Sequence, residues 1–194
     1  MKSFFSMFKD SADELKNIRC LTVSGILVAV YIVLDMFSLR IGESIKINFD
    51  FVATATIGML FGPIPAMLAA VAGDLVGCII TGNTPLPLLS ILEILKGLLY
   101  GTMLYKKSGK KLAAFSVMSR LIDTAVICLV LNTAALMYYG YMSRTIEAVY
   151  ARVGKLATEL IFFIPLMIVF MPVIRETYEK VSGRRLDTLD NSQK

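Results

Sequence analysis

Six apolar runs follow one another through the chain, and most of them approach the roughly 20 residues that an α-helix needs to cross a bilayer core. They cover residues 20–37, 49–61, 66–81, 88–105, 112–139 and 153–174. Glycine and proline separate several of them, as in the GPIP stretch at 62–65 and the GNTPLP stretch at 82–87. The pattern predicts an all-α bundle of six transmembrane helices.

The composition supports a membrane location. Hydrophobic residues make up 56% of the chain and charged residues 18%, and the mean hydropathy is +0.70. Soluble domains average about 45–50% apolar and about 25% charged residues. We therefore expect lipid to cover the excess apolar surface, and we treat residues 1–194 as a single transmembrane domain.

The basic residues set the predicted orientation. They gather before the first run, between the fourth and fifth runs and after the sixth, at Lys2, Lys9, Lys16, Arg19, Lys106, Lys107, Lys110, Lys111, Arg175, Lys180, Arg184 and Arg185. With six spans all three groups lie on one side, which the positive-inside rule makes cytoplasmic, together with both termini. The net charge of +5 therefore sets topology and does not predict nucleic-acid binding.

The side chains that most enzymes use are missing or scattered. The chain has no histidine, no Walker A motif and no HExxH or GxSxG motif. Its cysteines, Cys20, Cys78 and Cys128, lie in apolar stretches and form no CxxC pair. We therefore expect a protein that is not an enzyme and that binds neither a metal nor a cofactor.

Several ionisable side chains nevertheless fall inside the apolar runs, where each costs at least roughly 2.5–3.5 kcal/mol on insertion scales. Asp74 has no partner nearby in the sequence and is either a hydrogen-bonded packing residue or part of a cavity lining. Glu93 and Lys96 have the i,i+3 spacing of a helical ion pair, so they form either an internal pair or part of a site.

Two further groups have similar spacing. Arg120 and Asp123 follow the lysine cluster closely, and of a pair that extends to the aqueous boundary and a functional role we expect the pair. Lys155 and Glu159, with Arg152 one turn earlier, belong either to a binding site or to a solvated helix start at the external end of the sixth run.

The segment between the first two runs, residues 38–50, is predicted to be external. Apolar and polar residues alternate over 41–51, which indicates an extended lid rather than a helix. Above a cavity, Arg40 and Lys46 would meet an anionic ligand, whereas a simple connector would need neither. Asn132, near the external end of the fifth run, adds a polar group that can both donate and accept hydrogen bonds.

The order of these motifs resembles the substrate-binding S components of energy-coupling factor (ECF) transporters, and most closely their folate-specific members. The resemblance covers most of residues 20–175. It rests on the small-xxx-small pair Gly25 and Ala29, SIKINFDF at 44–51, GMLFGP at 58–63, Asp74 with Gly77, GLLYG at 97–101, Asn132-Thr133, and Arg152 and Lys155 before Pro165.

The resemblance implies a bacterial plasma-membrane protein that captures a vitamin outside and topples in the membrane to release it inside. It would dock on a transmembrane coupling subunit through Gly25 and Ala29, and two cytosolic ATPase subunits would use the ATP. Where this chain has Lys46, Asn48 and Asp50, folate-type members tend to have Arg, Gly and Gly, and they have FPGFT in place of LPLLS at 86–90. Riboflavin, thiamine, pantothenate or a queuosine precursor therefore stay open as ligands.

The chemical groups of folate match the charged and aromatic residues described above. A buried carboxylate, Asp74 or Glu93, can accept both donors of the pterin edge. The dianionic glutamyl tail would meet Arg40, Lys46, Arg152 and Lys155, and Phe49 or Tyr138 could stack on the aromatic middle. A small membrane enzyme that modifies lipids is the competing class, and it would need acids clustered at one membrane face. A purely structural membrane subunit is a third possibility, which would need neither the buried acids nor the cations of the lid.

Overall fold

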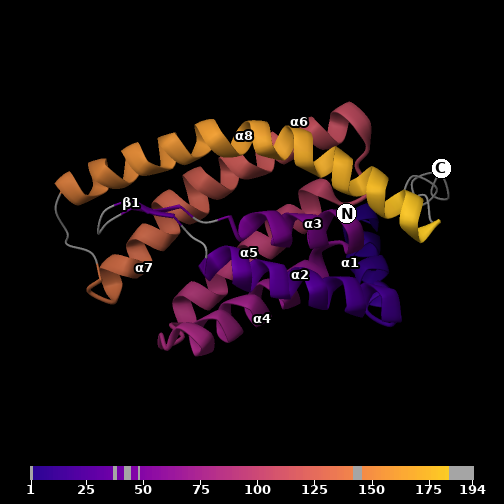
Figure 1. Ribbon diagram of the computed structural model, residues 1–194, viewed down its shortest axis with the longest axis horizontal. Helices are drawn as coiled ribbons and strands as arrows, with labels where there is room; N and C mark the ends of the chain where they lie inside the picture. Colours follow the sequence, from indigo (N-terminus) through magenta and orange to yellow (C-terminus); the bar gives the residue numbers. More distant parts are fainter. Residues whose placement is uncertain (1, 37–38, 42–44, 48, 142–145, 184–194) are drawn as a thin grey trace.

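The computed structural model describes residues 2–36, 39–41, 45–47, 49–141 and 146–183 (Figure 1). Helices form most of this part of the chain, with one two-stranded hairpin. The elements are α1 (Lys2–Glu14), α2 (Ile18–Met36), β1 (Leu39–Ile41), β2 (Ile45–Ile47), α3 (Phe51–Phe61), α4 (Pro63–Thr81), α5 (Pro87–Leu104), α6 (Gly109–Ile122), the π-helix η1 (Asp123–Leu131), α7 (Asn132–Tyr138) and α8 (Ile146–Ser182).

Five helical segments are long and apolar enough to cross a membrane. They are α2, α4, α5, the continuous helix formed by α6, η1 and α7, and most of α8. The remaining apolar helix, α3, has eleven residues and is therefore about 16 Å long, roughly half the thickness of a bilayer core. Helices thus occupy all six predicted runs, and the count of six membrane spans remains a prediction.

Helix α3 forms the centre of the bundle. Ten of its eleven residues are buried, and it packs against α2, α4, α5 and α8. Glycines bring three backbones together: a Cβ atom on Gly58 would lie 2.8 Å from the Gly101 nitrogen, and one on Gly101 would lie 2.3 Å from Pro63 Cα. The turn between α3 and α4 passes through Gly62, whose φ of +90° favours glycine.

The sequence patterns predict no helix before the first span, but the chain forms helix α1 there. Ser11 is buried and connects α1 to the turn between α3 and α4. Its hydroxyl donates to the Phe61 carbonyl and accepts from the Ile64 N–H, both at 3.0 Å. An ion pair of 2.8 Å between Asp10 and Lys106 attaches α1 to the end of α5.

The basic segments meet at one end of the bundle. Figure 1 shows α1 and the end of α8 at the end opposite the β1–β2 hairpin. The Asp10–Lys106 pair brings the lysine cluster to α1, and Arg19 donates to the Ser182 carbonyl at 3.0 Å. This arrangement agrees with one shared side for the three basic groups, and the assignment of that side as cytoplasmic remains a prediction.

The predicted extended segment forms an antiparallel hairpin in its described part. Strands β1 and β2 pair with Arg40 opposite Lys46. Residues 42–44 and 48, and the side chains of Arg40 and Lys46, lie outside the described part of the structure.

Candidate ligand-binding site

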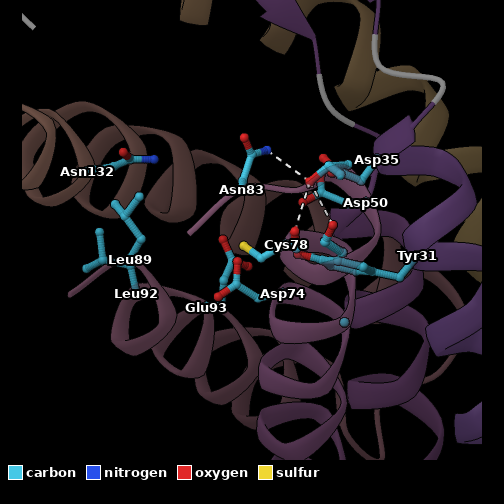
Figure 2. Close-up of a pocket in the computed structure, with 13 residues that line it drawn as sticks. Tyr31, Asp35, Asp50, Asp74, Cys78, Asn83, Leu89, Leu92, Glu93 and Asn132 are labelled. Carbon is cyan, nitrogen blue, oxygen red and sulfur yellow. Dashed lines mark hydrogen bonds between the residues drawn. The ribbon is translucent and has the colours of Figure 1, made fainter. Parts of the chain in front are cut away.

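Described residues line two adjoining cavities in the bundle. The larger, about 230 Å³, lies among α2, α4, α5 and α7 (Figure 2). Its charged lining residues are Asp35, Asp50, Asp74 and Glu93, all of them acids, so we call it the acidic cavity. Tyr31, Asn83 and Asn132 add polar groups to the lining.

The smaller cavity, about 70 Å³, is lined by both signs of charge, and we call it the mixed-charge cavity. Its cations come from α5, α6 and α8, and its acids from the start of α3, from η1 and from α8. These residues are Lys96, Arg120, Arg152 and Lys155, with Asp50, Asp123 and Glu159.

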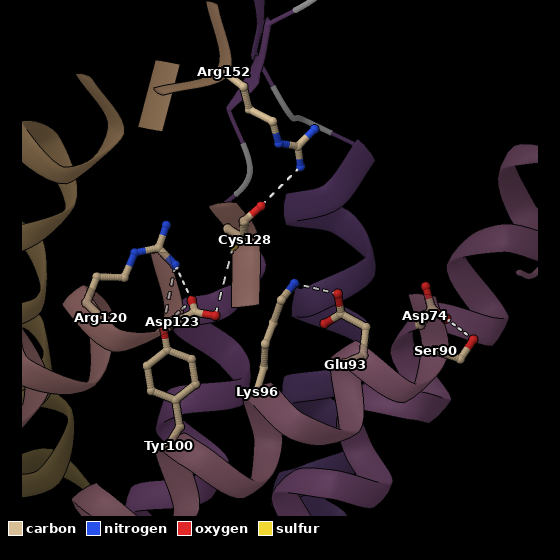
Figure 3. Close-up of polar contacts among 9 residues, drawn as sticks. All are labelled: Asp74, Ser90, Glu93, Lys96, Tyr100, Arg120, Asp123, Cys128 and Arg152. Atoms are coloured by element: carbon tan, nitrogen blue, oxygen red, sulfur yellow. Dashed lines mark hydrogen bonds and ion pairs between the residues drawn. The ribbon is translucent and has the colours of Figure 1, made fainter. Parts of the chain in front are cut away.

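The two cavities adjoin. Asp50 and Asn132 line both of them. Glu93 lines the acidic cavity and Lys96 the mixed-charge cavity, and an ion pair of 2.5 Å joins the two side chains (Figure 3). The two cavities therefore share part of their lining.

Most of the predicted charged residues already have partners. Asp74 accepts a hydrogen bond of 2.6 Å from Ser90 and also lines the acidic cavity, so both interpretations of Asp74 apply. Lys155 lies 3.5 Å from Glu159, which is 6% exposed. Because α8 begins at Ile146, these residues do not form a solvated helix start.

The prediction that Arg120 and Asp123 extend to the aqueous boundary is wrong, because both side chains are buried. Arg120 Nη1 and the Tyr100 hydroxyl each donate to Asp123 Oδ2 at 2.8 Å (Figure 3). The Arg120 guanidinium also lies 3.8 Å from the Phe51 ring centroid and 4.9 Å from that of Phe163. Arg120 is three turns into its helix, and these partners replace water.

Three polar residues in the linings have side-chain atoms that find no hydrogen-bond or ion-pair partner among the described residues. Asp50 is 6% exposed and makes no side-chain hydrogen bond or ion pair there. Asn132 is half-buried, and its amide has no partner within that part of the chain. Arg152 donates only from Nη2, to the Cys128 carbonyl at 3.4 Å, while its buried Nε has no acceptor. Such groups are available to a ligand.

Two predicted stacking residues lie outside the linings. Phe49 packs on Phe163, with ring centroids 5.2 Å apart. Tyr138 is 76% exposed and contacts Tyr139. The sequence patterns do not single out Asp50, because an aspartate before an apolar helix is ordinarily interpreted as a helix cap.

The predicted docking residues are on the surface of α2. Gly25 and Ala29 are both exposed, and a Cβ atom on Gly25 would meet no atom within 4 Å. This part of α2 is therefore open to a neighbouring helix.

Comparison with known proteins decides the family. Residues 15–180 match the family described as ECF-type riboflavin transporter, S component. The chain belongs to this family of S components. Because S components are transport proteins of the membrane, the predicted membrane location and the absence of enzymatic function are confirmed. No curated protein matches the sequence.

A solved structure shows the fold of this S component in a second protein. The crystal structure of FolT bound with folic acid matches with a TM-score of 0.65 and 23% sequence identity. The match covers 81% of this chain and 91% of FolT. At this identity the similarity establishes the helical fold.

Proposed function

We propose that this S component binds folate or a close relative for uptake. The observation that carries the proposal is the pair of adjoining cavities with different charges, where Asp50 lines both and Arg152 lines the mixed-charge one. A ligand that fills both needs N–H donors at one end and an anionic group at the other. Folate has these features in its pterin ring and its glutamyl tail.

The ring fits the acidic cavity, where a carboxylate can accept hydrogen bonds from its donor edge. The tail carboxylates then reach the mixed-charge cavity, where Arg152 and Lys155 are the nearest cations on α8. Arg40 and Lys46 stay in the proposal as residues of the lid that covers the tail. The similarity to FolT, whose structure contains folic acid, supports this choice.

Riboflavin is the second candidate, because the description of the family names it. Riboflavin carries no carboxylate, so it would leave Arg152 without a counter-charge. Its ring would offer the four acids a single imide N–H, and its further donors are neutral ribityl hydroxyl groups. The charges of the cavities therefore favour folate.

Transport requires partners, and we propose that they are a transmembrane coupling subunit and two cytosolic ATPase subunits. The S component would dock through the exposed Gly25 and Ala29 and topple in the plasma membrane of a bacterium, with six spans and both termini in the cytoplasm. ATP would be bound by the partner subunits.

Ligand binding can be tested on the purified protein in detergent. Native mass spectrometry identifies any retained vitamin, and thermal melts follow the addition of folic acid, riboflavin, thiamine, pantothenate or a queuosine precursor. We expect folic acid to be retained or to give the largest rise in melting temperature. A larger rise in melting temperature with another vitamin would identify that vitamin, rather than folate, as the ligand. No retained vitamin and no shift from any of them would contradict vitamin binding itself.

A further inference from the structure

Asp50 is the least explained charge in the acidic cavity. It is 6% exposed and lines both cavities, and no described side chain donates to it or forms an ion pair with it. Burial of a carboxylate without a partner is costly in free energy. A ligand that supplies donors would remove this cost.

The usual structural role of an aspartate at this place does not apply. Asp50 occupies the N-cap position of α3, where an aspartate ordinarily accepts a hydrogen bond from the backbone N–H two or three residues later. Asp50 makes no such bond, and its backbone has helical angles, φ −54° and ψ −34°. The helix dipole still favours a negative charge here, so the carboxylate remains a good acceptor.

The other acids of this cavity are already engaged. Ser90 donates to Asp74 at 2.6 Å, and Lys96 donates to Glu93 at 2.5 Å. Asp35 also takes part in a hydrogen-bonding or electrostatic interaction. Each of these acids would have to change an existing contact to offer both oxygens, whereas Asp50 would not.

The backbone around Asp50 is held in place. The neighbouring Phe51 ring is buried, lies under the Arg120 guanidinium at 3.8 Å and packs on Phe163 at 4.7 Å. Arg120 is in turn fixed by Asp123 at 2.8 Å. The start of α3 is thus anchored to α6, η1 and α8, and Asp50 is preorganised for a ligand.

We infer that Asp50 is the specificity-determining residue of the site and selects a ligand ring with two adjacent N–H donors, such as a 2-amino-4-oxopyrimidine edge. Its two oxygens accept both hydrogen bonds. The inference rests on the proposed function and deepens it, and it places ring recognition on Asp50 rather than on Asp74 or Glu93. Because folate-type members tend to have glycine at this position, the recognition by Asp50 is assigned to this chain and not to those members. The shared position of Asp50 then puts the ring in the acidic cavity and the rest of the ligand toward Arg152.

A cycle of protein and ligand changes tests this inference. Dissociation constants are measured by calorimetry for folic acid and for an analogue with hydrogen in place of the 2-amino group, with the wild type, Asp50→Asn and Asp74→Asn. In the wild type we expect loss of the amino group to weaken binding roughly tenfold or more. Asp50→Asn should weaken the binding of folic acid by a similar factor and the binding of the analogue by less than about threefold. Asp74→Asn, the matched comparison, should affect both ligands equally.

Each outcome has a distinct meaning. Equal weakening of both ligands by Asp50→Asn would make Asp50 a structural residue and overturn the inference, while folate binding stands. Equal affinity of the wild type for both ligands would overturn it without any variant. If Asp50→Asn fails to fold, Asp50→Ser replaces it in the cycle. If the wild type binds no folic acid, the proposed function fails and the inference falls with it.

Discussion

At the scale of single residues, the structure separates charges that hold the protein together from charges that are available to a ligand. Glu93, Lys96 and Asp74 have short contacts with neighbours on α5. Asp50 and the Nε atom of Arg152 have none among the described residues. Loss of a residue of the second kind should therefore change binding more than folding.

Arg152→Ala tests the placement of the glutamyl tail. The variant should lose a charge-assisted contact of about 1.5–3 kcal/mol with folic acid, which is roughly 10-fold or more in affinity. Pteroic acid, which lacks the glutamate, should bind the variant and the wild type alike. Fluorescence titration of both ligands gives the comparison. If Arg152→Ala and Lys46→Ala both leave folic acid affinity within about twofold, the tail lies elsewhere.

The Arg120–Asp123 pair should instead control stability. Arg120→Met or Asp123→Leu leaves one buried charge without its partner and should cost about 3–5 kcal/mol, whereas the double variant should cost less than the sum of the two. Unfolding in detergent, followed by circular dichroism, measures the loss. The exposed Asp13–Lys16 pair has the same i,i+3 spacing, and Asp13→Asn should leave the melting temperature unchanged. Fully additive losses would show that the two residues act independently.

Residue types alone indicate part of the site. Asp74 and Glu93 stand out because charges are rare in apolar runs, Arg152 stands out beside Lys155 at the start of the sixth run, and all three line a cavity. Arg120 is misassigned from the sequence because Tyr100, its distant partner, lies on another helix. Asp50 is missed because it ends a polar segment, where a carboxylate needs no special explanation.

At the scale of elements, the close contact of α3, α4 and α5 depends on glycine. Gly101→Ala would place a Cβ atom 2.3 Å from the Pro63 Cα, so the helices must move apart. We expect a loss of about 1–3 kcal/mol or more in unfolding free energy. Gly154→Ala on α8 meets no atom within 4 Å and should stabilise the protein by about 0.5–1 kcal/mol. Equal melting temperatures for the two variants would contradict this packing.

The attachment of helix α1 to the bundle should depend on the Ser11 hydroxyl. Ser11→Ala leaves the Phe61 carbonyl and the Ile64 N–H without their partner, which should cost about 1–3 kcal/mol. We expect faster hydrogen exchange over residues 2–14. Ser108→Ala is the control, because Ser108 stands at a helix start without a side-chain cap bond. Unchanged exchange in Ser11→Ala would show that other contacts hold α1 to the bundle.

The elements could be predicted to different extents. Apolar runs predict helices because long apolar segments in lipid must satisfy their backbone hydrogen bonds internally. Helix α1 is missed because it is short and carries polar residues. The sequence patterns also do not predict the central position of α3, because an apolar helix in the core has the same composition as one that faces lipid.

At the scale of the whole molecule, the exposed face of α2 should be required for uptake of the ligand but not for its binding. Gly25→Leu and Ala29→Leu should retain folic acid affinity and lose uptake in cells that also contain the coupling and ATPase subunits, because bulky side chains prevent close helix approach. Val169→Phe on α8, at a position 63% exposed, is the control and should transport normally. Normal uptake by both α2 variants would show that the docking surface lies elsewhere on the protein.

The unpaired side chains also have an electrical consequence for the empty protein. Asp50 and Arg152 carry opposite charges within a bundle that lipid surrounds, and neither neutralises the other directly in the described structure. In the proposed site, the N–H donors of the ligand would solvate Asp50 by hydrogen bonds, and its carboxylate would act as a counter-ion to Arg152 alone. Under the proposed function, each of these two side chains then has a partner in the loaded protein, which would lower the cost of holding them at membrane depth.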